Sequence, residues 1–283
     1  MNYDDQLNEL IKNALAEDIG DGDHSTLSSI DKNARGKAVL KIKQAGILAG
    51  MAVAEKIFSF MQKDIVFKPF KKDGEHMLPG ENAFEVEAHV HTILQCERLV
   101  LNCMQRMCGI ATLTSKYTAK LKNYKTKLLD TRKTTPGFRL LEKEAVRIGG
   151  GFNHRFGLYD MIMLKDNHID YSGGIENAIN KAYDYVQNYK PGLKIEIETR
   201  SINDVIKVMA IGKVDRIMLD NFTPENIKEA LAVIDGRYET EASGGINYEN
   251  LELYAATGVD YISSGAIIHQ AVSLDLSLKA AGI

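Results

Sequence analysis

The feature that most constrains the fold is a regular alternation of short apolar segments and amphipathic segments after Lys125. The apolar segments have strand length and lie at residues 127–130, 161–165, 194–198, 216–220, 238–243 and 259–265. Helical patterns fill the gaps, such as residues 201–212 and 223–234. Ser201 and Thr223 stand where N-caps belong, and Pro224 stands at a first helical position. This alternation predicts parallel strands, either in an α/β barrel or in an open doubly wound sheet.

Two observations favour the barrel. No G-x-G-x-x-G pattern follows the first of these strands, as it would in a dinucleotide-binding sheet. The strands also end in polar residues or glycine, namely Asp130, Lys165, Glu198, Asp220, Ser243 and Gly265. In α/β barrels the chemistry takes place at these carboxyl ends of the strands. The six or seven strands that can be counted fall short of a full eightfold barrel.

The first part of the chain has a different pattern. An amphipathic helix opens it, and strand-like segments at 37–46, 64–70 and 83–90 are mixed with a helical segment at 51–61. A long helical stretch follows from Thr92 to about Leu121. This mixture without strict alternation indicates a small α+β domain. We therefore expect a first domain at 1–110 and a barrel at 111–270, with the tail 271–283 packing back on the first domain.

Composition excludes several classes of protein. The chain of 283 residues is 45% hydrophobic and has a net charge of −3, so it can bury a large core and shows no polybasic surface for nucleic acid or membrane. No apolar run is long enough for a transmembrane helix, and the acidic N-terminus is unlike a secretory signal. The spacing of Cys96, Cys103 and Cys108 fits neither a disulfide nor a zinc site. We expect reduced cysteines and a cytoplasmic protein.

Two acidic strand ends are candidates for a metal site. The segment "KIEIE" alternates strictly, so Glu196 and Glu198 share one face, which a barrel would turn inward. Buried carboxylates are costly unless a cation or metal accompanies them. Glu198 and Asp220 could hold a magnesium ion that carries phosphates, or could accept hydrogen bonds from sugar hydroxyls. A solvated edge strand is the alternative interpretation of the pattern.

Glycines and cations complete the set of strand-end groups. Gly244, Gly245 and Gly265 in "EASGGI" and "ISSGA" would let backbone N–H groups approach a phosphate, although glycine also simply makes tight turns. Six cations lie near two strand ends: Arg132, Lys133, Arg139, His154, Arg155 and Lys165. Arginine suits planar carboxylates and lysine suits phosphate. Surface salt bridges are the alternative for any one cation. The whole set predicts a substrate that carries both carboxylates and phosphates.

A family resemblance rests on these same motifs. The stretch "DTRKTTPGFRLLEKEAVRIGGGFNHRFGLYDMIMLKDNHI", with "EDIGDGDHST", "CERLVLNCMQRMCGIAT", "LDNF" and "EASGGI", resembles the quinolinate phosphoribosyltransferases, or carboxylating nicotinate-nucleotide pyrophosphorylases. The resemblance implies a type II phosphoribosyltransferase fold, an N-terminal open-faced α/β sandwich followed by a seven-stranded, incomplete α/β barrel. It also implies transfer of phosphoribosyl from phosphoribosyl pyrophosphate to quinolinate with decarboxylation. The products would be nicotinate mononucleotide, pyrophosphate and carbon dioxide, on the route to NAD.

The resemblance further implies roles for individual residues. The cations that would bind the quinolinate carboxylates are Arg132, His154, Arg155 and Lys165, with Lys133 between the two substrates. Glu198 and Asp220 would contact the ribose hydroxyls and magnesium. The phosphate would lie against Ser243, Gly244, Gly245 and Gly265. Arg98 would reach into the site of a neighbouring subunit, which implies a homodimer and leaves open its further assembly into a hexamer.

Three other functions remain open at this point. Lys165 could form a Schiff base in an aldolase, although its ionic neighbourhood argues against the apolar setting that such a lysine needs. A non-enzymatic sensor would need only the two glycine loops, which leaves the acids and cations unexplained. A phosphoribosyltransferase acting on nicotinate has a single carboxylate to bind, and so should need fewer cations.

Overall fold

The computed structural model describes residues 2–282, and its internal contacts divide the chain into two compact units. The N-terminal unit contains the chain up to Ser115, the segment Thr134–Gly150 and the chain from Ile267 on. The barrel unit contains Lys116–Lys133 and Gly151–Ala266. Each unit is described by itself. In the described residues, no helix is both long enough and apolar enough to cross a membrane.

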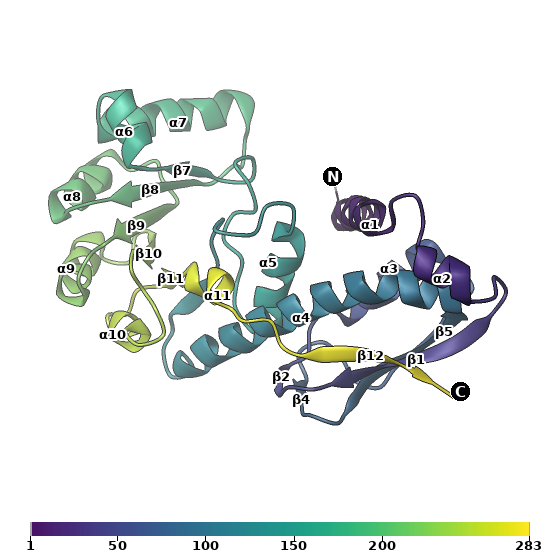
Figure 1. Ribbon diagram of the computed structural model, residues 1–283. Helices are drawn as coiled ribbons and strands as arrows, with labels where there is room; N and C mark the ends of the chain where they lie inside the picture. Colours follow the sequence, from purple (N-terminus) through teal and green to yellow (C-terminus); the bar gives the residue numbers. More distant parts are fainter. Residues whose placement is uncertain (1, 283) are drawn as a thin grey trace. The chain divides into compact units, whose positions relative to one another are not determined.

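The N-terminal unit is built on an antiparallel sheet with strand order β12-β1-β5-β3. These strands are β1 (Arg35–Ile42), β3 (Val66–Pro69), β5 (Asn82–His89) and β12 (Leu276–Ala281). Strand β12 comes from the end of the chain and pairs with β1, with Leu278 opposite Leu40 (Figure 1). A separate short pair is formed by β2 (Gly46–Ile47) and β4 (His76–Met77).

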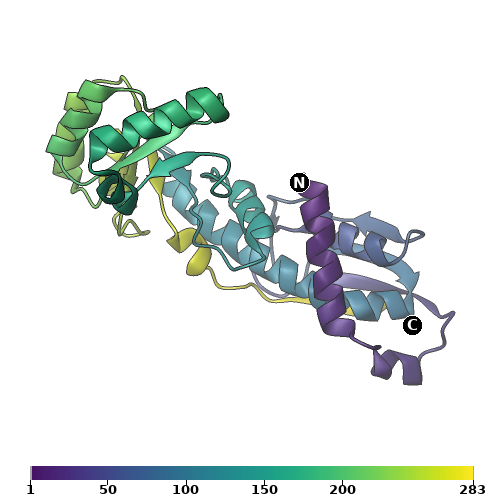
Figure 2. The ribbon, with the colours of Figure 1, turned by 90° about the horizontal axis from the view of Figure 1, so that it is seen from above.

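The sheet is accompanied by the helices of the same unit. The helices are α1 (Tyr3–Ile19), α2 (His24–Ser29), α3 (Met51–Met61), α4 (Val90–Lys120), which continues into the barrel unit, and α5 (Arg139–Ile148). Phe58 of α3 meets Phe84 of β5 edge to face, with ring centroids 6.2 Å apart. Figures 1 and 2 show α3 and α4 along the same face of the sheet. This one-sided cover is the open-faced sandwich that the family resemblance implied.

The barrel unit contains six parallel strands in the order β6-β11-β10-β9-β8-β7. Their bounds are β6 (Lys127–Leu129), β7 (Ile162–Leu164), β8 (Ile195–Thr199), β9 (Arg216–Asp220), β10 (Glu239–Ser243) and β11 (Tyr261–Ser263). Phe152 forms a parallel bridge with Leu129, so one residue occupies the seventh position beside β6. The prediction of an incomplete α/β barrel is confirmed.

The helices between these strands follow the sequence signals. They are α6 (Asp166–Ser172), α7 (Ile175–Tyr189), α8 (Ile202–Ile211), α9 (Pro224–Ile234), α10 (Leu251–Ala255) and α11 (Ala266–His269). Ser201 Oγ accepts the N–H of Asp204 at 3.2 Å, and Thr223 Oγ1 accepts the N–H of Asn226 at 3.3 Å. Both N-cap predictions are therefore confirmed, with Pro224 at the start of α9.

The segment 134–150 groups with the N-terminal unit, which a division of the chain at residue 110 does not anticipate. Glu142 of α5 is fully buried and accepts two hydrogen bonds from Arg106 of α4, at 3.0 and 2.9 Å. Gly149 lies so close to α4 that a Cβ would be 2.5 Å from the carbonyl oxygen of Ala111. The run of glycines at 149–151 thus includes one that close packing requires.

Arg106 also binds the last part of the chain. Arg106 Nη1 donates to the carbonyl of Ala271 at 2.7 Å, and Nη2 donates to that of Ile268 at 2.9 Å. Thr135 completes the cluster, because its N–H and hydroxyl both donate to the carboxylate of Glu142, at 2.8 and 3.0 Å. This Arg106–Glu142 network joins α4, α5 and the segment before β12 by charge-assisted hydrogen bonds.

The cysteines are free, as predicted, and they are buried in α4. Burial raises the pKa of Cys96, Cys103 and Cys108 to about 12, so the thiols stay protonated at neutral pH.

Candidate active site at the carboxyl ends of the barrel strands

The barrel interior carries acidic side chains where the alternation predicted them. Glu196 and Glu198 of β8 are 0% and 7% exposed, so both carboxylates point into the unit. The parallel register places Glu198 beside Met218 of β9, and Asp220 beside Ser243 of β10. Strand-end groups from three neighbouring strands therefore lie along one edge of the sheet.

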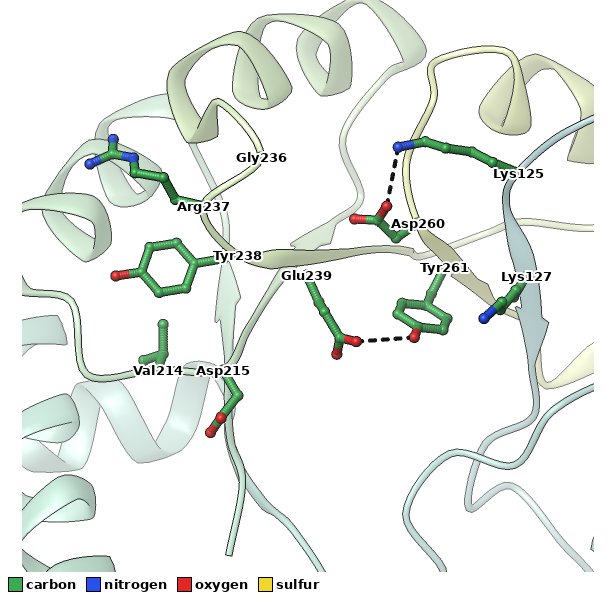
Figure 3. Close-up of a pocket in the computed structure, with 10 residues that line it drawn as sticks. All are labelled: Lys125, Lys127, Val214, Asp215, Gly236, Arg237, Tyr238, Glu239, Asp260 and Tyr261. Atoms are coloured by element: carbon green, nitrogen blue, oxygen red, sulfur yellow. Dashed lines mark hydrogen bonds and ion pairs between the residues drawn. The ribbon is translucent and has the colours of Figure 1, made fainter. Parts of the chain in front are cut away.

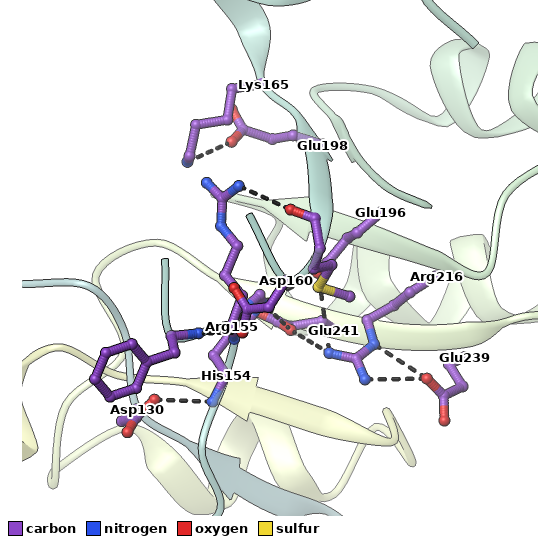
Figure 4. A network of polar contacts seen from close by, with 12 residues as sticks. Asp130, His154, Arg155, Asp160, Lys165, Glu196, Glu198, Arg216, Glu239 and Glu241 are labelled. Atoms are coloured by element: carbon purple, nitrogen blue, oxygen red, sulfur yellow. Dashed lines mark hydrogen bonds and ion pairs between the residues drawn. The ribbon is translucent and has the colours of Figure 1, made fainter. Parts of the chain in front are cut away.

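Lys165 supplies the cation that Glu198 needs. It follows β7 directly, and its Nζ lies 3.0 Å from Glu198 Oε2 (Figure 4). The lysine side chain is 47% exposed whereas that of Glu198 is 8% exposed, so the ammonium group remains accessible to a ligand. This pairing argues against a Schiff base at Lys165, which requires a neutral amine.

Arg132 and Arg155 lie near each other in the barrel unit. Burial, and after it the positive charge of Arg132, lowers the pKa of Arg155. Arg155 Nη1 donates to the carbonyl of Met161 at 3.2 Å, and its guanidinium points toward the Lys165–Glu198 pair in Figure 4. An anion bound near both guanidinium groups would relieve their repulsion. Lys133, the next residue after Arg132, is exposed.

Two of the predicted cations belong to the N-terminal unit. Arg139 begins α5, and its Nε donates to Thr134 Oγ1 at 3.0 Å. Arg98 is exposed on α4. Both residues lie in the N-terminal unit.

The glycine loop after β10 is sterically required. Gly244 has a φ of +96°, and a Cβ there would collide with the side chain and backbone nitrogen of Asn221 in the loop after β9. Gly245 has a φ of +62°, and Asn221 has a φ of +57° and donates its N–H to the carbonyl of Ser243 at 2.8 Å. After β11, helix α11 begins at Ala266, directly after Gly265. Backbone in these conformations can present N–H groups to a phosphate.

A buried charged cluster below these groups was largely missed by sequence reasoning. We call it the barrel-core cluster, and it consists of His154, Glu196, Arg216 and Glu241 (Figure 4). His154 Nε2 lies 3.1 Å from Glu196 Oε2 and 3.3 Å from Glu241 Oε2, and Arg216 Nη1 lies 3.1 Å from Glu241 Oε2. The side chains are at most 11% exposed. Strict alternation in "RIMLD" and "ETEAS" could have identified Arg216 and Glu241 as inward-facing residues.

Burial and the neighbouring charges shift the pKa values of two members of the cluster. Burial, reinforced by the charge of Glu241, raises the pKa of Glu196 to about 7. Burial by itself would lower the pKa of His154, but contacts with Glu196 and Glu241 outweigh it and raise the pKa to about 9. His154 Nδ1, however, accepts the backbone N–H of Arg155 at 2.6 Å, which requires a lone pair on Nδ1. The geometry therefore favours a neutral ring protonated on Nε2, with the additional proton on Glu196.

This cluster also resembles a metal site in its ligand types. Ligand atoms of His154, Glu196 and Glu241 lie within 4.8 Å of one another, the one such group of three or more ligands in residues 2–282. The guanidinium of Arg216 already contacts Glu241 at 3.1 Å and lies 3.9 Å from Glu196. Because this fixed cation neutralises the carboxylates, we interpret the group as an ion-pair network.

Glu198 and Asp220 fit a magnesium ion in a different way. They provide two carboxylates at the carboxyl ends of neighbouring strands, and Asp220 is partly exposed. Magnesium commonly uses one or two protein carboxylates and takes its other ligands from water and substrate phosphates. The donor set is therefore suitable for a magnesium ion that arrives with a phosphorylated substrate.

A cavity of about 650 Å³ lies at the opposite end of the barrel (Figure 3). Its lining includes Asp215, Glu239, Asp260 and Lys125, at or before the starts of the strands. Three of its charged residues are in ion pairs: Lys125 Nζ lies 3.2 Å from Asp260, and Glu239 binds Arg216. Since residues at this end of a barrel generally serve stability, we do not assign the chemistry to this cavity.

The fold and the strand-end groups define a class of protein, an α/β-barrel enzyme that acts on an anionic, phosphate-bearing substrate. Family models support a particular assignment. The N-terminal domain of quinolinate phosphoribosyl transferase matches residues 23–108, and its C-terminal domain matches residues 110–279. The chain therefore belongs to the quinolinate phosphoribosyltransferase family.

Individual relatives agree with this assignment. The chain is 42% identical to the probable carboxylating nicotinate-nucleotide pyrophosphorylase of Bacillus subtilis, covering 96% of this chain and 93% of the relative. It is 41% identical to the chloroplastic enzyme of Arabidopsis thaliana, covering 96% and 82%. The crystal structure of NadC from Streptococcus pyogenes matches with a TM-score of 0.90 at 39% identity, covering 98% of both chains.

Proposed function

We propose that this chain transfers phosphoribosyl from phosphoribosyl pyrophosphate to quinolinate and decarboxylates the product. The reaction yields nicotinate mononucleotide, pyrophosphate and carbon dioxide for NAD biosynthesis. Family membership over both domains supports the reaction. The structural observation that carries the substrate assignment is the gathering of cations at the strand ends, where the guanidinium of Arg155 points toward the Lys165–Glu198 pair and Arg132 lies close enough to lower the pKa of Arg155. Three cations suit a planar dicarboxylate better than a monocarboxylate.

The remaining groups divide between the two substrates. Arg132, Arg155 and Lys165 bind the quinolinate carboxylates, and Lys133 lies between the substrates. Glu198 and Asp220 bind the ribose hydroxyls and magnesium, which would stabilise the negative charge of the departing pyrophosphate. The phosphate-binding residues are Ser243, Gly244, Gly245 and Gly265. The contacts of His154 with Glu196, Glu241 and the backbone of Arg155 favour an indirect role for this residue.

The chemistry requires orientation and charge stabilisation but no side-chain nucleophile. The carboxylate contacts hold the quinolinate ring so that its nitrogen faces the anomeric carbon, where the nitrogen–carbon bond forms as the bond to pyrophosphate breaks. The cations at the strand ends stabilise the charge that develops on the leaving group. Once alkylated, the positive ring nitrogen stabilises the carbanion left by the departing carbon dioxide, and this carbanion then takes up a proton.

A direct assay tests this function and its nearest rival. The chain is incubated with phosphoribosyl pyrophosphate, magnesium and either quinolinate or nicotinate, and nicotinate mononucleotide is measured. We expect product from quinolinate with release of carbon dioxide, and little from nicotinate. Comparable turnover of nicotinate would show that the second carboxylate is not recognised and would refute the assignment.

We also propose that the active enzyme is a cytoplasmic homodimer in which Arg98 of one subunit completes the site of the other. The exposure of Arg98 on a helix of the N-terminal unit supports this proposal. The test mixes inactive Arg98→Ala and Lys165→Ala subunits after reversible dissociation. In a crossed dimer one site carries both substitutions and the other carries neither, so about a quarter of the wild-type activity should return if pairing is random. If the mixture stays inactive although the subunits are shown to exchange, the shared site is refuted.

A further inference from the structure

His154 is engaged by protein groups at both ring nitrogens. Nδ1 accepts the N–H of Arg155 at 2.6 Å, and Nε2 faces the carboxylates of Glu196 and Glu241 at 3.1 and 3.3 Å. The side chain is 6% exposed. With Nδ1 accepting a hydrogen bond and Nε2 buried against two carboxylates, the ring has no accessible N–H for a carboxylate of the substrate. Its contacts instead lead to the backbone of the next residue, Arg155.

The backbone around His154 is fixed by a second buried group. Asp130, at the end of β6, is fully buried, and its Oδ1 accepts the backbone N–H of His154 at 2.8 Å. Its Oδ2 accepts the side-chain amide of Asn153 at 2.5 Å. The side chain of Arg155 therefore leaves a backbone that is anchored on both sides, and its guanidinium is directed by the bond to the carbonyl of Met161.

The carboxylates that face His154 are themselves held in place. Arg216 donates to Glu241 at 3.1 Å and to Glu239 at 3.0 Å, so one guanidinium connects two neighbouring positions of β10 (Figure 4). Tyr261 donates its hydroxyl to Glu239 at 3.1 Å. A continuous set of polar contacts thus runs from the strand starts through the barrel-core cluster to Arg155. Such networks fix the orientation of the group at their end.

We propose that His154 is a positioning residue, which orients Arg155 toward a carboxylate of the substrate and does not itself contact the substrate. The identity of that substrate, quinolinate, rests on the function proposed above. Arg155 is then the group that binds the ligand, and the barrel-core cluster is the support that holds it.

A double-mutant cycle on quinolinate binding distinguishes positioning from direct contact. If His154 acts only through Arg155, His154→Ala weakens binding about tenfold or more, but adding it to Arg155→Ala causes no further loss. The matched control combines His154→Ala with Lys165→Ala, where the two losses should multiply. If the losses also multiply for His154→Ala with Arg155→Ala, His154 makes its own contact and the proposal is wrong.

Two conservative variants separate the roles of the ring nitrogens and avoid an empty cavity. The side-chain oxygen in His154→Asn can replace Nδ1 as the acceptor for Arg155, whereas the amide in His154→Gln reaches only the position of Nε2. We expect His154→Asn to retain more quinolinate affinity than His154→Gln. Equal losses in the two variants would contradict positioning through the Arg155 backbone.

A third measurement needs no ligand. Nitrogen NMR of the unliganded protein should show Nδ1 of His154 unprotonated and Nε2 protonated, and protonation of Nδ1 would overturn the proposal. If the wild-type protein bound no quinolinate, the proposed function would fail, while the NMR measurement would still decide whether His154 holds Arg155.

Discussion

Replacing Arg106 with methionine should destabilise the N-terminal unit, because Arg106 is the only guanidinium that contacts Glu142 in the described chain. The substitution removes two hydrogen bonds to that carboxylate and two to the carbonyls of Ala271 and Ile268. It leaves Glu142, with 0% of its side chain exposed, as a buried charge without its cation. Breaking a buried pair in this way costs about 3–5 kcal/mol.

For Arg106→Met we expect the lower end of this range of destabilisation, because the N–H and hydroxyl of Thr135 continue to donate to Glu142. We therefore predict a loss of about 3 kcal/mol in the free energy of unfolding, measured by urea denaturation. Arg147→Met is the matched control, because that arginine is 64% exposed and pairs only with Glu144 three residues earlier. It should change stability by less than about 0.5 kcal/mol. Equal effects of Arg106→Met and Arg147→Met would refute the claim that the buried Arg106–Glu142 pair stabilises this unit.

Three further predictions concern the barrel unit. Burial raises the pKa of Glu196 from 4.5 to about 7, so the stability that its bound proton contributes is present below pH 4.5 and lost as the pH rises through 7. The wild-type protein should therefore lose stability between pH 4.5 and pH 7, whereas Glu196→Gln should not. The difference in free energy of unfolding between the variant and the wild type, measured by urea denaturation, should rise by up to about 3 kcal/mol over this range, and a difference that does not change with pH would contradict the raised pKa. Arg132→Ala should weaken quinolinate binding by about 2–5 kcal/mol and phosphoribosyl pyrophosphate binding far less, and equal calorimetric losses would mean that Arg132 is misassigned. Activity should disappear with excess chelator and return with magnesium, and full turnover with chelator present would exclude the metal.

The strands of the barrel could be predicted because each is a short apolar segment between amphipathic helices. The polar residues at their ends could be predicted for the same reason, since a charge such as Glu198 stands out in a buried strand. Helix α5 could not be assigned to its unit in this way. Its position depends on the pairing of Glu142 with Arg106, which are 36 residues apart, and no local pattern records such a contact.

The orientation of His154 was also beyond prediction. It follows the glycines at 149–151 in a segment without periodicity, so nothing local shows that its ring turns toward Glu196 and Glu241. The sequence therefore predicts only that His154 is a cation near an anion site. The positions of the two carboxylates in the folded barrel are the basis for the positioning role proposed above.

Quinolinate that carries carbon-14 in the carboxylate next to the ring nitrogen provides the most direct test of the central claim. With phosphoribosyl pyrophosphate and magnesium, the chain should release the label as carbon dioxide in equal amount to the nicotinate mononucleotide formed. Without phosphoribosyl pyrophosphate the label should stay in quinolinate, because decarboxylation requires the alkylated nitrogen. Release of label without phosphoribosyl pyrophosphate, or a ribosylated product that keeps the label, would contradict the account.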